Sequence, residues 1–374
     1  MIFANASKAG FLFFLCVLVI VALGLVMVFN TTAAEVLDRA LDRSTHYALI
    51  KQLLYASLGV LGAAGLWMLG YQSVIKLSGA FLAICSVLLV LVFIPGIGQQ
   101  LNGAHRWLSL FGHSFQPSEF VKYLIPIYYI HRFTAAPKTF TMREFIKLLA
   151  VLAVPAGLIL IEPDNGTVAI IFAALIILFI LTRIRWIYWA LPLTILCAVG
   201  VAVASRMPHV AGRIQIYLHP ELDLKGKGHQ PYQAKIAAGS GGFLGRGLGQ
   251  SLQKMDYLPE ARSDYIAAIF AEEFGFIGIA GLIVLYGLMA FFGFSIAQRA
   301  PDSGGFYLVS ILTFLITFQA FLNLGVVSGL LPSKGINLPF FSHGGSSLLA
   351  NFMVVSLILN VAHHTVRKVD VSKA

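Results

Sequence analysis

The segment 239–273 holds the residues best suited to chemistry, because it is polar, basic and glycine-rich and carries Asp264 ahead of an apolar stretch. A carboxylate there can act as a general base that takes the proton from an attacking hydroxyl, while Arg or Lys stabilises a phosphate leaving group. The alternative is a structural acid in the first turn of a helix, where free N–H groups favour negative charge. Both interpretations place Asp264 at the start of a helix.

Basic side chains lie along the approach to this acid. The glycines between positions 239 and 249 superficially match a dinucleotide-binding fingerprint, but no strand-helix-strand pattern surrounds them, so we reject that interpretation. Glycine-rich backbone beside cations can instead come close to phosphate oxygens; the alternative is a flexible loop with solvated charge. The candidates for substrate binding in this region are Arg213, Gln233, Lys235 and Arg246.

A second polar cluster precedes the fourth apolar stretch. Glu119 and Lys122, three residues apart, share one face of a predicted helix at the membrane boundary, where charges are costly and usually functional or paired. We expect this pair to position a neighbouring catalytic group; an ordinary helix beginning after Pro117 is the alternative. Arg106 and Trp107 are further candidates for substrate contact, although Trp107 also suits an interfacial anchor.

The third cluster is a break rich in Gly, Pro and Ser, at 323–347, between two apolar stretches. Irregular backbone is tolerated at membrane depth only where it lines a polar cavity or is buried in protein. We therefore expect this segment to form one wall of the site, with Ser342 and Ser346 as candidate substrate contacts.

The elements that must position these residues are membrane helices. Of 374 residues, 58% are hydrophobic and only 11% charged, against roughly 25% charged in a soluble domain. We predict an all-α integral membrane protein, one domain over 1–374, with a large extracytoplasmic loop at 205–264 between the seventh and eighth spans. At about 20 residues per crossing, about ten spans are expected: 11–29, 53–69, 77–94, 119–131, 146–161, 166–182, 186–204, 274–296, 306–330 and 346–362.

The charges of the short loops predict the orientation. The net charge of +10 is distributed as a topology signal and not as a nucleic-acid surface, since most Lys and Arg fall on the side that holds the N-terminus. This bias predicts cytoplasmic termini and places the loop 205–264 outside the cell. The three cysteines, an odd number within predicted spans, imply no disulfide framework: Cys16, Cys85 and Cys197.

The order of these motifs resembles the SEDS family of cell-wall synthases over nearly the whole chain. The resemblance rests on NGAxRW and QPSExxK elements at 102–122, a PDxGT turn at 163–167, the glycine run at 228–249, an LPExx[ST]D element at 258–264 and the signature at 323–347. The elements at 253–261 and 331–339 are more similar to division-type than to elongation-type members. The chain departs from the family pattern at three places. His343 stands where the family has a tyrosine, Asn165 occupies a variable position, and residues 261–263 are Ala-Arg-Ser where Ala-His-Thr is commoner.

The resemblance implies a peptidoglycan glycosyltransferase that polymerises lipid II, an undecaprenyl-linked saccharide, at the outer face of the cytoplasmic membrane. It implies that Asp264 deprotonates the 4-hydroxyl of the acceptor, and that Glu119 and Lys122 order this base. Undecaprenyl pyrophosphate would then leave with inversion. The candidates for holding the pyrophosphate are Arg106, Arg213, Lys235 and Arg246.

The resemblance also implies partners: a class B penicillin-binding protein, which is a transpeptidase, and other divisome membrane proteins. Whether a divalent cation, Mg²⁺ or Mn²⁺, assists the departing pyrophosphate is left open, because the sequence shows no metal-ligand spacing. Two other functions remain open. A lipid II flippase predicts charges deep in several spans, whereas here they crowd the loops. A silent scaffold that only recruits the transpeptidase would tolerate loss of Asp264.

Overall fold

The computed structural model describes residues 4–39, 45–101, 104–110, 113–136, 140–204, 215–224, 226, 228–255, 258–333 and 335–373. Ten long helices run through these residues, and each overlaps one of the ten predicted spans. They are α1 (Ala4–Arg39), α2 (Tyr47–Leu69), α3 (Tyr71–Leu91), α4 (Ser118–Thr134), α5 (Met142–Ile161), α6 (Asn165–Leu181), α7 (Trp186–Ala204), α10 (Ile266–Gln298), α11 (Ser303–Val327) and α12 (Gly345–Lys373).

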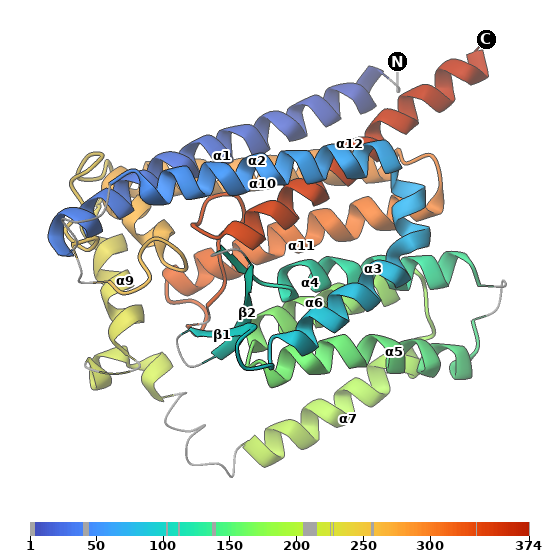
Figure 1. The fold of residues 1–374 in the computed structure, drawn as a ribbon, viewed down its shortest axis with the longest axis horizontal. Coiled ribbons are helices and arrows are strands. Elements are labelled where there is room, and N and C mark those ends of the chain that lie inside the picture. Colours follow the sequence, from blue (N-terminus) through green and yellow to red (C-terminus); the bar gives the residue numbers. More distant parts are fainter. Residues whose placement is uncertain are drawn as a thin grey trace.

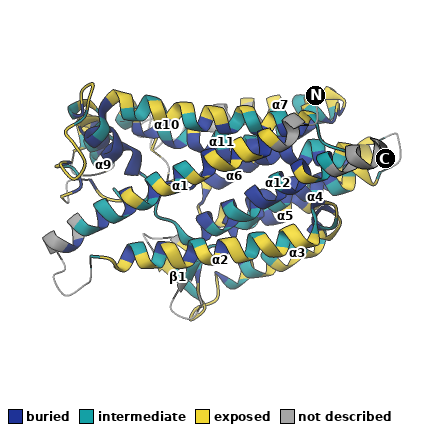
Figure 2. Cartoon of the chain, turned by 90° about the horizontal axis from the view of Figure 1, so that it is seen from above, coloured by how far each residue is buried: buried dark blue, intermediate teal, exposed yellow. Residues whose placement is uncertain are grey.

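Seven of these helices, among the described residues, are long and apolar enough to cross a membrane: α1, α2, α3, α5, α10, α11 and α12. The helices α4 and α6 have only 17 residues each. The all-helical membrane architecture is thus confirmed, whereas the number of spans stays a prediction. Exposed residues lie along the outward sides of α2, α3 and α10, and buried residues gather in α11 and α12 (Figure 2). These two central helices therefore form the core of the bundle.

The two termini lie at one end of the bundle, and α9 (His229–Ser240) lies with the long loops at the other (Figure 1). A short 3₁₀ helix, η1 (Pro220–Asp223), precedes α9. The segment 95–119, which the sequence indicates as a polar loop, forms a three-stranded antiparallel sheet of β1 (Gly98–Leu101), β2 (Ala104–Leu110) and β3 (His113–Phe115). Strands of three to seven residues give little periodic signal beside helices of about twenty.

Local signals explain several helix boundaries. Gly70, with φ of 78°, ends α2 and starts α3 without an intervening loop. Thr141 and Glu144 form a capping box at α5, and the Asp302 side chain caps α11. The eighth span is predicted to begin at 274, whereas α10 begins at Ile266 and is interrupted by non-helical backbone at Gly275. Hydropathy therefore locates the part of α10 that follows Gly275 and misses its first two turns, which are apolar up to Ala271 and end in Glu272 and Glu273.

Candidate active site

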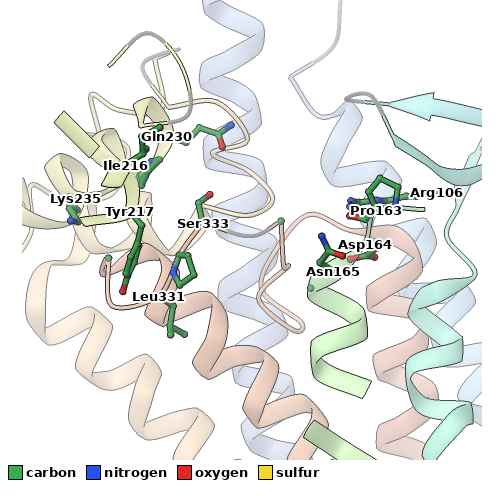
Figure 3. Close-up of a pocket in the computed structure, with 15 residues that line it drawn as sticks. Arg106, Pro163, Asp164, Asn165, Ile216, Tyr217, Gln230, Lys235, Leu331 and Ser333 are labelled. Atoms are coloured by element: carbon green, nitrogen blue, oxygen red, sulfur yellow. Dashed lines mark hydrogen bonds between the residues drawn. The ribbon is translucent and has the colours of Figure 1, made fainter. Parts of the chain in front are cut away.

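A cavity of about 490 Å³ opens at the end of the bundle that carries α9. Arg106 of β2 and the turn between α5 and α6 form one wall (Figure 3). Side chains of α9 and of the turn before η1 face them, and the irregular segment 329–335 closes the cavity between the two walls. The lining residues used below are Arg106, Asp164, Tyr217, Lys235, Gly329, Ser333 and Gly335. The predicted wall at 323–347 thus borders the cavity at 329–335.

Hydrogen bonds from neighbouring segments hold residues 330–333 in place. The Tyr217 hydroxyl donates to the Leu330 carbonyl at 2.6 Å, and the Tyr265 and Ser333 hydroxyls lie 2.8 Å apart. Gly329 has a φ of 77°, and a Cβ there would lie 2.2 Å from Cε of Lys235. The methylenes of Lys235 therefore lie directly over a glycine. Close approach of this kind fixes the lysine at the cavity wall.

Arg106 is held by main-chain acceptors. Its Nε donates to the Glu162 carbonyl at 3.0 Å, and its Nη2 donates to the Pro163 carbonyl at 2.7 Å. Both acceptors belong to the tight turn between α5 and α6, and Arg106 forms no ion pair with a carboxylate of the residues that the structure describes. A guanidinium fixed in this way is suited to an anionic ligand in the cavity.

Asp264 lies beside the cavity, directly behind Gly335. A Cβ added to Gly335 would lie 3.1 Å from Oδ2 of Asp264. Among the residues that the structure describes, its carboxylate accepts no hydrogen bond, and the N-cap of α10 is Tyr265, so the capping alternative has no support. Burial, followed by the charge of Glu260, raises the pKa of Asp264 to about 7, although Arg106 opposes the shift. A base poised near neutrality is the arrangement that general-base catalysis favours.

Two amides of α11, neither selected from the sequence as a site residue, fix the backbone around this acid. Asn323 Nδ2 donates to the carbonyl of Asp264 at 2.8 Å and to that of Ile336 at 2.7 Å. Gln319, one helical turn earlier, donates from Nε2 to the Asn337 carbonyl at 2.8 Å. The segment that carries the base and the segment that lines the cavity are therefore tied to the same helix face.

The Glu119–Lys122 pair is connected to the site through Gln319. Lys122 is only 1% exposed; its ammonium pairs with Glu119 and donates to Gln319 Oε1 at 2.8 Å. This pair and Asp264 share no hydrogen bond or ion pair among the described residues, so the contacts that link them run through Gln319 and Asn323 of α11. The expectation of a direct hydrogen bond or ion pair to the base is therefore replaced by an indirect connection.

Glu162 is indicated by the sequence only as part of a turn. It is completely buried, and neither carboxylate oxygen has a hydrogen-bond partner among the described residues. Burial, followed by repulsion from Asp164, raises the pKa of Glu162 to about 8, and Arg106 opposes the shift. The neutral acid is therefore the dominant form at pH 7. A buried polar group without partners beside a binding cavity indicates a functional constraint on this turn.

This shift predicts how stability depends on pH. Because the folded pKa lies above the unfolded value of 4.5, stability contributed by neutral Glu162 is full below about pH 4.5 and declines until pH passes about 8. Glu162→Gln removes this titration, so its melting temperature should exceed that of the wild type increasingly between pH 6 and pH 9. Thermal melts in detergent at both pH values measure the gap. A gap that stays constant or shrinks would contradict neutral Glu162.

Several predicted contacts instead serve internal packing. The hydroxyl of Ser342 accepts from the Leu338 amide at 2.8 Å, and that of Ser346 accepts from the Gln116 amide at 2.9 Å. Trp107 and Gln233 are half-buried and do not line the cavity. Arg213 lies outside the described residues. Of the substrate-binding candidates whose side chains are described, Arg106 and Lys235 reach the cavity.

The glycine run packs against α10 and does not line the cavity. A Cβ on Gly245 would lie 2.1 Å from the Glu273 carbonyl oxygen, and the Arg246 amide donates to the Glu272 carbonyl. Arg246 also pairs with the Glu272 carboxylate at 3.4 Å, and buried Lys254 pairs with Glu273 at 2.8 Å. These cations are therefore engaged with α10, which explains why phosphate binding by the run finds no support here.

The packing predicts a graded effect of alanine in this run. Gly245→Ala adds a clash to a left-handed backbone with φ of 80°, so it should cost more than the 1–2 kcal/mol that roughly accompanies such a backbone alone. Gly249→Ala, with φ of 84° and open space, should show only the backbone cost. Gly239→Ala, with neither feature and inside α9, should be at least as stable as the wild type. Melting temperatures in any other order would contradict this packing role.

Metal binding finds no ready-made ligand set. Among the described residues, no group of three or more His, Cys, Asp and Glu side chains gathers in a geometry that could hold a metal ion. Of the acids near the cavity, Asp164 caps α6 and accepts from Thr167, and Glu162 is completely buried. A divalent cation that assists the pyrophosphate therefore stays a prediction.

Fold and site together define a multi-pass helical membrane protein with an ionisable site at the bundle end opposite its termini. The model of a family described as "Cell cycle protein", covering FtsW, RodA and SpoVE, matches residues 11–367. A probable peptidoglycan glycosyltransferase FtsW of Trichlorobacter lovleyi is 35% identical over 93% of this chain and 91% of its own. Stage V sporulation protein E of Bacillus subtilis is 36% identical over 93% of this chain and 95% of its own length.

A solved structure described as "Structural coordination of polymerization and crosslinking by a peptidoglycan synthase complex" has a TM-score of 0.76. Its sequence is 26% identical to this chain, and the match covers 94% of this chain and 97% of the chain in that structure. The chain belongs to the FtsW, RodA and SpoVE family of cell cycle proteins, which confirms the family inferred from the motifs. The SEDS resemblance therefore holds over nearly the whole length.

Proposed function

We propose that this chain is a peptidoglycan glycosyltransferase that polymerises lipid II at the outer face of the cytoplasmic membrane, for septal wall synthesis during division. The observation that carries the proposal is Asp264, a carboxylate whose pKa is raised to about 7, beside a cavity that Arg106 and Lys235 make positive. Relatives named as peptidoglycan glycosyltransferase FtsW support the activity and the division role.

The proposed reaction is one displacement at an anomeric carbon. Asp264 takes the proton of the acceptor 4-hydroxyl while that oxygen forms the new glycosidic bond. The bond between the anomeric carbon and the pyrophosphate oxygen breaks, the electron pair leaves with undecaprenyl pyrophosphate, and the configuration inverts. Protonated Asp264 then returns its proton to solvent through the open cavity.

Arg106 and Lys235 are the proposed contacts for the pyrophosphate, because both line the cavity. Opposite walls of the cavity carry them (Figure 3), so a diphosphate between them would meet one cation on each side. Glu119, Lys122, Gln319 and Asn323 are proposed as positioning residues, since their hydrogen bonds end on the backbone around Asp264 and on the cavity wall.

The orientation is part of the proposal. Arg132, Lys147, Arg183 and Arg185 lie in the loop-side turns of α4 to α7, and the positive-inside rule places such residues in the cytoplasm. Both termini then lie in the cytoplasm and the cavity faces outward. A class B penicillin-binding protein is the proposed partner, which is supported by the similar solved complex, described as coordinating polymerization and crosslinking.

The test is a polymerisation assay on the purified full chain, alone and with its transpeptidase, using lipid II in detergent. Glycan polymer from either sample supports the proposal. Translocation of fluorescent lipid II across liposomes without polymer would replace it with the flippase, and recruitment of the transpeptidase without either activity would replace it with the scaffold. Locating the fluorescently tagged chain in dividing cells distinguishes septal synthesis from elongation-type synthesis.

A further inference from the structure

A second cavity, of about 400 Å³, lies between the end of α4 and the beginning of α5. This connection is at the same end of the bundle as the two termini, opposite the candidate active site (Figure 1). The lining combines charged, aromatic and aliphatic side chains, among them Tyr128, Arg132, Phe140, Glu144, Lys147 and Val151. Nothing in the proposed reaction uses this cavity.

The charges of this second cavity add up to one positive charge. Arg132 and Lys147 are exposed, and neither forms an ion pair in the part of the chain that the structure describes. Glu144 is already engaged, because its Oε2 accepts from the amide and the hydroxyl of Thr141, each at 2.8 Å. These two cations thus stand beside one carboxylate that has a single oxygen left to accept a hydrogen bond.

The apolar side of the cavity continues onto the membrane-facing surface of α5. Leu148 is buried at the cavity wall, Val151 is 48% exposed, and Val154, one turn further, is 61% exposed. Lys147, Val151 and Val154 are spaced by four and three residues, so they lie on one helix face. A cationic mouth therefore leads directly to an apolar track along α5.

We propose that this cavity binds a monoanionic phospholipid of the cytoplasmic leaflet. Arg132 and Lys147 would hold the phosphodiester, the free oxygen of Glu144 would accept a hydroxyl of a glycerol headgroup, and an acyl chain would lie along Val151 and Val154. Basic pockets between transmembrane helices on the cytoplasmic side are suited to anionic headgroups. The net charge of +1 in the cavity is matched by a headgroup of net charge −1 and is left uncompensated by a zwitterionic headgroup.

The test is native mass spectrometry of the full chain released from detergent containing equal amounts of phosphatidylglycerol, phosphatidylethanolamine and phosphatidylcholine. We expect selective retention of one phosphatidylglycerol, reduced at least about tenfold in Arg132→Gln/Lys147→Gln. The matched control, Arg183→Gln/Arg185→Gln, removes two exposed cations that lie outside the cavity lining, and should retain the lipid.

Three outcomes would overturn the proposal: equal loss in both double variants, retention of phosphatidylethanolamine as strong as that of phosphatidylglycerol, or displacement of the lipid by soluble glycerophosphoglycerol at equal concentration. A second measurement does not depend on variants. Photoactivatable phosphatidylglycerol added to the wild-type chain should crosslink to peptides from 128–154, and crosslinks confined to other helices would also overturn the proposal.

Discussion

Asp264→Asn should lower the rate of lipid II polymerisation by about 10²–10⁴-fold, the range that a general base supplies. The amide keeps the size of the side chain and loses the ability to accept the hydroxyl proton. Stability should not fall, because burial raises the pKa of Asp264 to about 7, so that above pH 7 the native fold holds a disfavoured charge that asparagine removes. The measurement is polymer formation from purified lipid II, paired with a thermal melt in detergent.

The pH profile gives a second readout of the same prediction. The wild-type rate should rise as pH passes through about 7, since only the deprotonated carboxylate accepts a proton. The residual rate of Asp264→Asn should lack this rise. Polymerisation by the variant within tenfold of the wild type would remove the base assignment, and a melting temperature well below that of the wild type would make the variant uninformative and direct the test to Asp264→Glu.

Lys122→Met should destabilise the protein by about 3–5 kcal/mol, the cost of leaving a buried charge without its partner. Lys122 is 1% exposed and Glu119 8%, so Glu119 would remain buried with no cation. Gln319, which accepts from Lys122 and donates to the Asn337 carbonyl, would also lose its anchor next to the cavity. A thermal melt should show this loss, together with reduced polymerisation.

The double variant Glu119→Gln/Lys122→Met separates charge from position. It removes both buried charges, so it should recover most of the lost stability. If the pair orders the site through α11, polymerisation should stay below wild type even where the melting temperature recovers. If Lys122→Met were as stable as the wild type, the buried ion pair would be contradicted. Full activity in the double variant would show that the pair is only structural.

Much of the architecture could be predicted because membrane helices are encoded locally. A window of about twenty apolar residues must satisfy its own backbone hydrogen bonds in lipid, so hydropathy alone located the ten helices. The sequence indicates Asp264 because this acid lies where a polar, basic, glycine-rich segment meets the start of a predicted helix. Glu119 and Lys122 were selected because their spacing of three places them on one face.

Other features depend on contacts between residues far apart in the chain. The sequence leaves the glycine run open between phosphate binding and a flexible, solvated loop, whereas in the structure Gly245 packs against the Glu273 carbonyl and Arg246 pairs with Glu272. The roles of Gln319 and Asn323 could not be predicted, since a single amide within an apolar helix gives no indication of its acceptor. The short strands at 98–115 lacked a period long enough to identify.

Composition and spacing along the chain are enough to predict a membrane helical bundle, the side that its charges favour, and the acid that stands where chemistry is possible. Which cations line the cavity beside that acid depends instead on the packing of the bundle. Arg106 and Lys235 line the cavity, while Arg246 and Lys254 pair with α10. The two pairs of cations differ because segments far apart in the chain must pack together before a cation meets a buried carboxylate. No local pattern of residues encodes that packing.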